Sequence, residues 1–146
     1  MQVLEVSAGR FVLRLSLGEK LMETLRRFVV ERRIGAGFIR GLGASRSAEL
    51  AYYLIDEKRY DPIPVEGFTE VVSLLGNVSW KEDGEPMVHV HSALSRRDGS
   101  TVAGHVLEIE VGATMEIDLE VLPGRLSRKL DPEIGLPLLA CHEGAC

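Results

Sequence analysis

Three of the four histidines in this chain lie within one short segment, at positions His89, His91 and His105. His89 and His91 are two positions apart, so both side chains leave the same face of a β-strand. Neutral imidazoles are common ligands of zinc and similar divalent ions. A third imidazole on the same face would complete a ligand set for such an ion.

The residues between the two histidine-bearing segments predict how these segments pair. Residues 97–99 read Arg-Asp-Gly, which is typical of a three-residue hairpin loop with its glycine in the left-handed conformation. If Arg96 and Ser100 close this loop, His91 lies directly opposite His105. A slip of one residue would send His105 to the other face. We therefore predict a metal site on one face of one hairpin; the alternative is ordinary solvated or hydrogen-bonded strand histidines.

Length and composition limit the class of protein. A chain of 146 residues, with 45% hydrophobic and 27% charged residues, is expected to form one globular domain. The formal net charge of −5 disfavours non-specific binding to nucleic acid, which needs a dense basic surface. Neither a membrane-spanning apolar run nor a secretory signal is evident, so we expect a soluble cytoplasmic protein without a membrane partner.

Both cysteines, Cys141 and Cys146, lie in the last six residues, with His142 between them. Together they suggest a second metal cluster. Their spacing matches no zinc motif, so a loose C-terminal tail is the favoured interpretation. The whole segment 125–146 contains Pro132 and Pro137, and we expect it to be an irregular arm that follows a folded domain of residues 1–124.

The periodicity of apolar residues predicts one main helix among many strands. Ser16 and Glu19 have the spacing of a capping box, and Gly35 is a candidate C-cap. Between them, four apolar residues recur at helical spacing: Leu21, Leu25, Phe28 and Val29. Strands are predicted at residues 3–7, 11–16, 37–42, 48–56, 70–79, 87–94, 101–110 and 114–122. A surface loop is predicted at residues 60–67. This order indicates an α+β domain with a largely antiparallel sheet.

Four segments, FIRGLGA, EVVSLLGNVS, HVH and AGH, occur in this order and resemble the plants-and-prokaryotes-conserved (PPC) domain. The resemblance extends from Glu19 to about Leu122. It implies a curved antiparallel sheet with a helix, and assembly as a homotrimer. It also implies a metal ion on His89, His91 and His105, with zinc as the first candidate. The chain is also distantly similar to acetolactate decarboxylase, a metal enzyme with an HxH-then-His ligand pattern.

In plants, the PPC domain is joined to short basic AT-hook segments that bind DNA. No hook of the RGRP type occurs in this chain. A DNA-binding role would instead require a basic face on the predicted helix. Its arginines are equally explained as a solvated face: Arg26, Arg27, Arg32 and Arg33.

Three histidine ligands would leave one coordination position for water or a small anionic ligand. We expect Glu70 to act as an acid/base or supporting carboxylate, and Arg40 to clamp a carboxylate or phosphate. Ion pairs with a neighbouring strand or subunit are the alternatives. Glu108 is expected on the face opposite the histidines. Three tyrosines either line a pocket or pack at an edge: Tyr52, Tyr53 and Tyr60.

Three functional hypotheses follow. The first is a metal-binding homotrimer with a regulatory or ligand-binding role. The second is a metal-dependent lyase or hydrolase that acts on a small oxo-acid or ester. The third is a DNA-binding protein.

Overall fold

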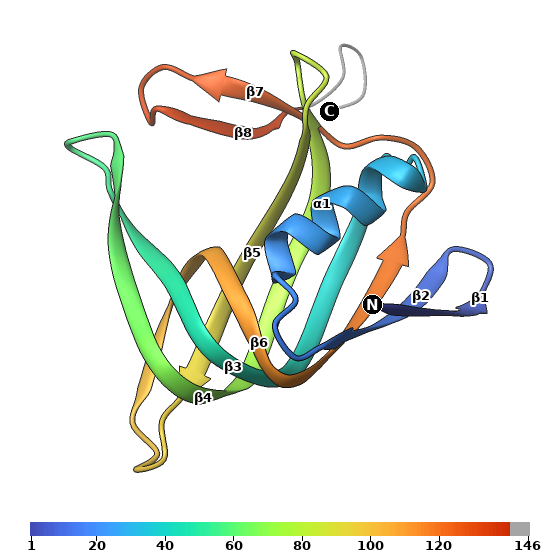
Figure 1. The fold of residues 1–146 in the computed structure, drawn as a ribbon. Coiled ribbons are helices and arrows are strands. Elements are labelled where there is room, and N and C mark those ends of the chain that lie inside the picture. Colours follow the sequence, from blue (N-terminus) through green and yellow to red (C-terminus); the bar gives the residue numbers. More distant parts are fainter. Residues whose placement is uncertain (141–146) are drawn as a thin grey trace.

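The computed structural model describes residues 1–140, which form one helix and eight strands (Figure 1). The elements, in chain order, are β1 (Gln2–Ser7), β2 (Arg10–Ser16), α1 (Leu21–Glu31), β3 (Gly37–Leu54), β4 (Arg59–Lys81), β5 (Pro86–Ser95), β6 (Thr101–Val121), β7 (Ser127–Asp131) and β8 (Leu136–Ala140). The α+β class and the largely antiparallel, curved sheet are confirmed. Cys141, His142 and Cys146 lie outside the described residues.

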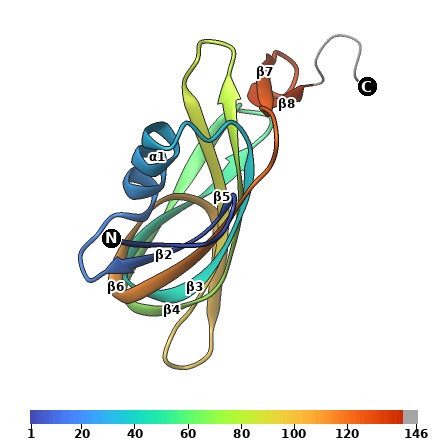
Figure 2. The ribbon, with the colours of Figure 1, turned by 90° about the vertical axis from the view of Figure 1, so that its right-hand side faces the viewer.

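Four long strands pair in a closed ring. β3 pairs with β4, β4 with β5, β5 with β6, and β6 returns to β3, always in antiparallel orientation. β2 and then β1 extend the sheet from β6. Helix α1 lies on one side of the sheet (Figure 2). Apolar side chains of the helix and of the sheet together form the core. None of the described helices is long and apolar enough to cross a membrane.

The helix begins later than its capping box predicted. Lys20 precedes α1 without a side-chain cap, and the Ser16 amide donates to the Glu19 carboxylate at 2.8 Å in the turn before the helix. The carboxylate of Glu108 on β6 accepts the amide of Met22 at 2.7 Å instead. An acid that is remote in sequence thus takes the place of the local cap, where the helix dipole favours negative charge.

The helix end also differs from the prediction, because Arg33 rather than Gly35 takes the left-handed conformation, with φ 53°. The amides of Arg33 and Ile34 return to the carbonyls of Val30 and Val29, which is a Schellman motif. Gly35 serves close packing: a Cβ atom there would lie 2.4 Å from the carbonyl oxygen of Gly124.

Residues 60–67 are part of β4 and not the surface loop that their prolines predicted. Pro62 pairs with Ala51 and Pro64 with Glu49 of β3. β5 pairs with β4 only from Glu70 onward, so this half of β4 is a sheet edge. Proline lacks an amide hydrogen and is tolerated where that side of the strand has no partner. The separate strands predicted at 37–42 and 48–56 are likewise one strand, β3.

The C-terminal arm is not irregular, because β7 and β8 form a hairpin. The Asp131 carboxylate accepts the amides of Glu133 and Ile134 and so shapes the turn. β7 joins the main sheet through two parallel pairs with the end of β4, at Trp80 and Lys81.

Replacing Glu108 with alanine should lower the free energy of unfolding by about 1–2 kcal/mol, because the first turn of α1 loses its acceptor. Urea unfolding followed by circular dichroism measures this loss. Glu133→Ala removes an exposed acid from the β7–β8 turn and is the matched control. Equal stability of the two variants would show that Glu108 does not cap the helix.

Candidate metal centre

The predicted register of the β5–β6 hairpin is confirmed. The amide of Arg96 donates to the Ser100 carbonyl at 2.8 Å, and Gly99 has φ 83°. His91 pairs directly with His105. Because β5 alternates these histidines with the buried Val88 and Val90, the imidazoles leave the sheet on the face opposite the core.

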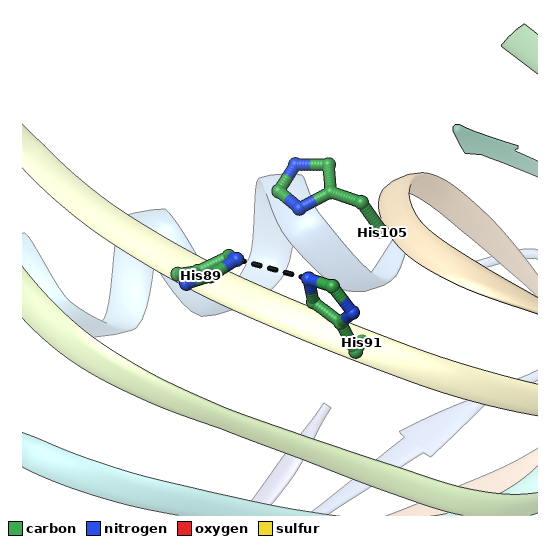
Figure 3. A group of neighbouring side chains, drawn as sticks. All are labelled: His89, His91 and His105. Atoms are coloured by element: carbon green, nitrogen blue, oxygen red, sulfur yellow. Dashed lines mark hydrogen bonds between the residues drawn. The ribbon is translucent and has the colours of Figure 1, made fainter. Parts of the chain in front are cut away.

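The three imidazoles converge on one point, as Figure 3 shows. One ligand atom from each ring lies within 4.8 Å of the others. The Nε2 atoms of His89 and His91 are 3.1 Å apart. Two nitrogens bound tetrahedrally to one zinc ion would be about 3.3 Å apart, since Zn–N bonds are about 2.0–2.1 Å long. The pair is therefore spaced almost as a zinc ion requires.

Burial favours the uncharged form of two of these rings. The pKa of His89 falls from 6.5 to about 4, first through burial and then through the positive charge of Arg128 and the neighbouring His91. The pKa of His105 also falls to about 4, through burial and the nearby His89, His91 and Arg26. Neutral rings keep the lone pair that binds a metal.

One atom of this cluster has no protein partner. Nδ1 of His105 is buried and makes no hydrogen bond within residues 1–140. A buried polar atom is costly to leave unpaired, and a bound ion would satisfy it. Together with the spacing and the neutral rings, this orphan atom fits a divalent metal held by His89, His91 and His105.

Aromatic residues from the end of the β3–β4 pair flank the histidines. The ring of Tyr60 stacks on His105, with centroids 4.6 Å apart, and Tyr53 packs edge-on against Tyr60. A cavity of about 420 Å³ opens here, lined by Ala51, Tyr52, Tyr53, Tyr60, His91, Gly104 and His105. The centre therefore borders a space that a small molecule could enter.

Arg128, from the C-terminal hairpin, is a charged residue that contacts one of the three histidines, His89. Its Nη2 atom lies 3.4 Å from Nδ1 of His89 and 3.0 Å from Oδ1 of Asn77. The local sequence gave no indication of this contact, because Arg128 lies in the segment expected to be an irregular arm. Its position depends on the two parallel pairs between β7 and β4.

Arg40 is on the same sheet face as the histidines but not beside them. It lies opposite Leu75, which in turn lies opposite His91, so about 10 Å separates the Cα atoms of Arg40 and His91. Its Nε donates to Asp118 at 2.8 Å. Asp118 also bonds Arg10, and the two guanidinium groups hold its pKa at about 2. The expected role as an anion clamp stays a prediction.

Glu70 lies farther away. It pairs with Ser95, five residues along β4 from Leu75, which corresponds to roughly 15 Å of strand. The structure does not bring its exposed carboxylate to the histidines, and its acid/base role also stays a prediction. Glu108 binds the start of α1, as described above.

The low pKa values of His89 and His105 predict a pH dependence of stability for the metal-free protein. Protons bind these rings more tightly in the unfolded chain, where their pKa is about 6.5, than in the folded chain, where it is about 4. Their contribution to stability is thus complete above about pH 6.5 and is lost progressively as the pH falls towards 4. The lowered pKa of Asp118 affects stability only at lower pH, between its ordinary pKa of 3.8 and its pKa of about 2 in the folded chain.

Urea titrations across this range measure the effect. In the double variant His89→Gln/His105→Gln, the free energy of unfolding should depend less steeply on pH than in the original chain, between about pH 4 and pH 6.5. The same slope in both proteins would mean that the rings are not buried in the neutral form.

Solved structures with the same fold cover nearly the whole chain. A plant- and prokaryote-conserved protein from Pyrococcus horikoshii is 32% identical, with a TM-score of 0.83, over 97% of this chain and 94% of its own. A metal-containing protein from Archaeoglobus fulgidus is 35% identical, with a TM-score of 0.82, over 96% and 99%. A protein from Ralstonia eutropha, provisionally named as DNA-binding, is 27% identical, with a TM-score of 0.88, over 96% of each chain.

The distant likeness to acetolactate decarboxylase is a likeness of fold alone. A Staphylococcus aureus protein described as similar to that enzyme is 12% identical, with a TM-score of 0.55, over 80% of this chain and 53% of its own. No curated protein sequence matches the chain. The model of the Plants and Prokaryotes Conserved (PCC) domain matches residues 5–123. The chain therefore belongs to the Plants and Prokaryotes Conserved domain family.

Proposed function

We propose that this chain is a zinc-binding protein whose His89, His91 and His105 hold the ion and leave one position open to a small ligand. The observation that carries the proposal is the convergence of three imidazoles, with Nε2 atoms of two of them 3.1 Å apart. The Archaeoglobus relative, which is called metal-containing, supports it. A zinc ion bound in this way polarises an oxygen ligand and lowers the pKa of bound water to about 7.

Ligand binding is better supported than catalysis. A metal-dependent lyase or hydrolase needs an acid or base close to the ion. Within residues 1–140, no hydrogen bond or ion pair joins a carboxylate to the three histidines. We therefore place the regulatory or ligand-binding role first.

Assembly as a homotrimer belongs to the same proposal. The exposed large apolar side chains of β3 and β4 include four that are each 55–61% exposed: Phe38, Leu42, Val72 and Leu75. We call these four residues the outer apolar patch. A cluster of this kind is unusual on a monomer and is typical of a surface that contacts another subunit. Because Leu75 pairs with His91, the proposed interface lies next to the metal centre.

DNA binding has less support. The Ralstonia relative carries that provisional name, but this chain has a net charge of −5. Among the arginines of the helix region, Arg27 pairs with Glu23, and Arg32 lies over the rings of Phe11 and Phe28. These contacts favour a structural role for part of that surface.

Replacing His91 with alanine should abolish stoichiometric zinc binding, because two imidazoles remain where three are needed. Metal analysis of the purified proteins measures this. His142→Ala removes the fourth histidine of the chain and should retain the zinc of the original protein. Full zinc content in His91→Ala would refute the ligand assignment.

Replacing Val72 with glutamate should dissociate the assembly, because it adds a charge to the outer apolar patch. Sedimentation velocity should give three times the 16.1 kDa mass for the original chain and a single copy for Val72→Glu. Leu17→Glu, at a residue 63% exposed in the turn before α1, is the matched control and should stay trimeric. A monomeric original chain would contradict the trimer.

A further inference from the structure

Arg128 is a buried cation whose hydrogen-bond partners are all neutral. The residue is only 6% exposed. Its Nε donates to the Ser79 hydroxyl at 2.8 Å, and its Nη1 donates to the carbonyl of Pro137 at 2.8 Å. Its Nη2 contacts Asn77 and His89. No carboxylate within residues 1–140 forms an ion pair with it.

This arrangement leaves positive charge uncompensated. Burying a guanidinium group without a negative partner is costly. The nearby centre adds to the imbalance, because its ligands are uncharged histidines and Arg26 also contributes positive potential at His105. A divalent ion on these ligands would bring two more positive charges beside Arg128. A negative ligand from solution would compensate them.

The contact between Arg128 and His89 must change when a metal binds. Arginine only donates hydrogen bonds, so Nδ1 of His89 is the acceptor and the ring proton is on Nε2. Nε2 is the atom that faces His91. An ion on Nε2 requires the proton on Nδ1, which then cannot accept from Arg128. One N–H group of the guanidinium is thereby released for another acceptor.

The cavity beside the histidines offers room and a further donor. Tyr60 lines it, stacks on His105, and has a hydroxyl group with no hydrogen-bond partner within the described part of the chain. Arg128 lies close enough to Tyr60 to influence its hydroxyl electrostatically. A ligand in the cavity would therefore meet the open metal position, a phenol donor and the field of Arg128.

We infer that the fourth ligand of the metal is a small oxyanion, a carboxylate or a phosphate, and that Arg128 selects it for its negative charge. The inference rests on the proposed function, because it requires an ion on the three histidines. Arg128 acts through electrostatics and through His89, and is a positioning residue. The C-terminal hairpin that carries Arg128 is therefore part of the ligand site.

Cobalt-substituted protein tests the inference through visible absorption, which reports the ligands of the ion. Acetate and inorganic phosphate are titrated separately, in a buffer that does not coordinate cobalt, with neutral acetamide as a reference. We expect a saturable spectral change with acetate or phosphate, at one anion per cobalt, and none with acetamide. Whichever anion responds identifies the ligand as carboxylate or phosphate. No saturable change with either anion overturns the inference, whereas failure to bind cobalt overturns the proposed function.

Two variants assign the selectivity to Arg128. Arg128→Gln should weaken anion binding about tenfold or more, the size expected when a buried charge near the ligand is lost. Arg97→Gln makes the same change in net charge at the exposed hairpin tip and should bind as the original chain does. If the Arg128→Gln variant does not fold, Arg128→Lys serves as the test, because lysine keeps the positive charge. The Arg128→Lys variant should still bind the anion. Equal affinity in Arg128→Gln and Arg97→Gln, or loss of binding in a folded Arg128→Lys, overturns the role of Arg128.

Discussion

The site depends on one constraint, the pairing of His91 with His105 across the β5–β6 hairpin. β6 pairs with β5 only from Thr101 to His105 and continues along β3. The histidine pair is therefore the last pair of the hairpin, at the point where the two strands separate. This position keeps the rings on one face and leaves space beside them. A shift of one residue would bury one imidazole in the core and expose an apolar side chain.

The sequence could predict those features that short-range chemistry determines. The register of the β5–β6 hairpin could be predicted from two local features. These are the turn at residues 97–99 and the two-residue spacing of His89 and His91. The start of α1 could not be predicted locally, because its acceptor, Glu108, lies 86 residues beyond Met22 in the chain. The contact of Arg128 with His89 could not be predicted locally either, because it depends on two pairs between β7 and β4, which are distant in the sequence.

Proline was the most misleading local signal. Pro62 and Pro64 indicated a loop, yet both lie in a half of β4 that has a neighbouring strand on one side only. In the C-terminal segment, Pro137 likewise lies in a strand, opposite Leu130. The two wrong predictions, a loop at residues 60–67 and an irregular arm at residues 125–146, both concern surroundings of the metal centre. The first half of β4 carries Tyr60, and the β7–β8 hairpin carries Arg128. The surroundings of a metal site are thus harder to predict than its ligands.

The central claim is that the three imidazoles hold one ion. Anomalous X-ray scattering at the zinc absorption edge, from crystals of zinc-loaded protein, tests it most directly. The account predicts one strong peak about 2.0–2.1 Å from a nitrogen of each of His89, His91 and His105. A strong peak elsewhere in the molecule, or none at these rings, would contradict it.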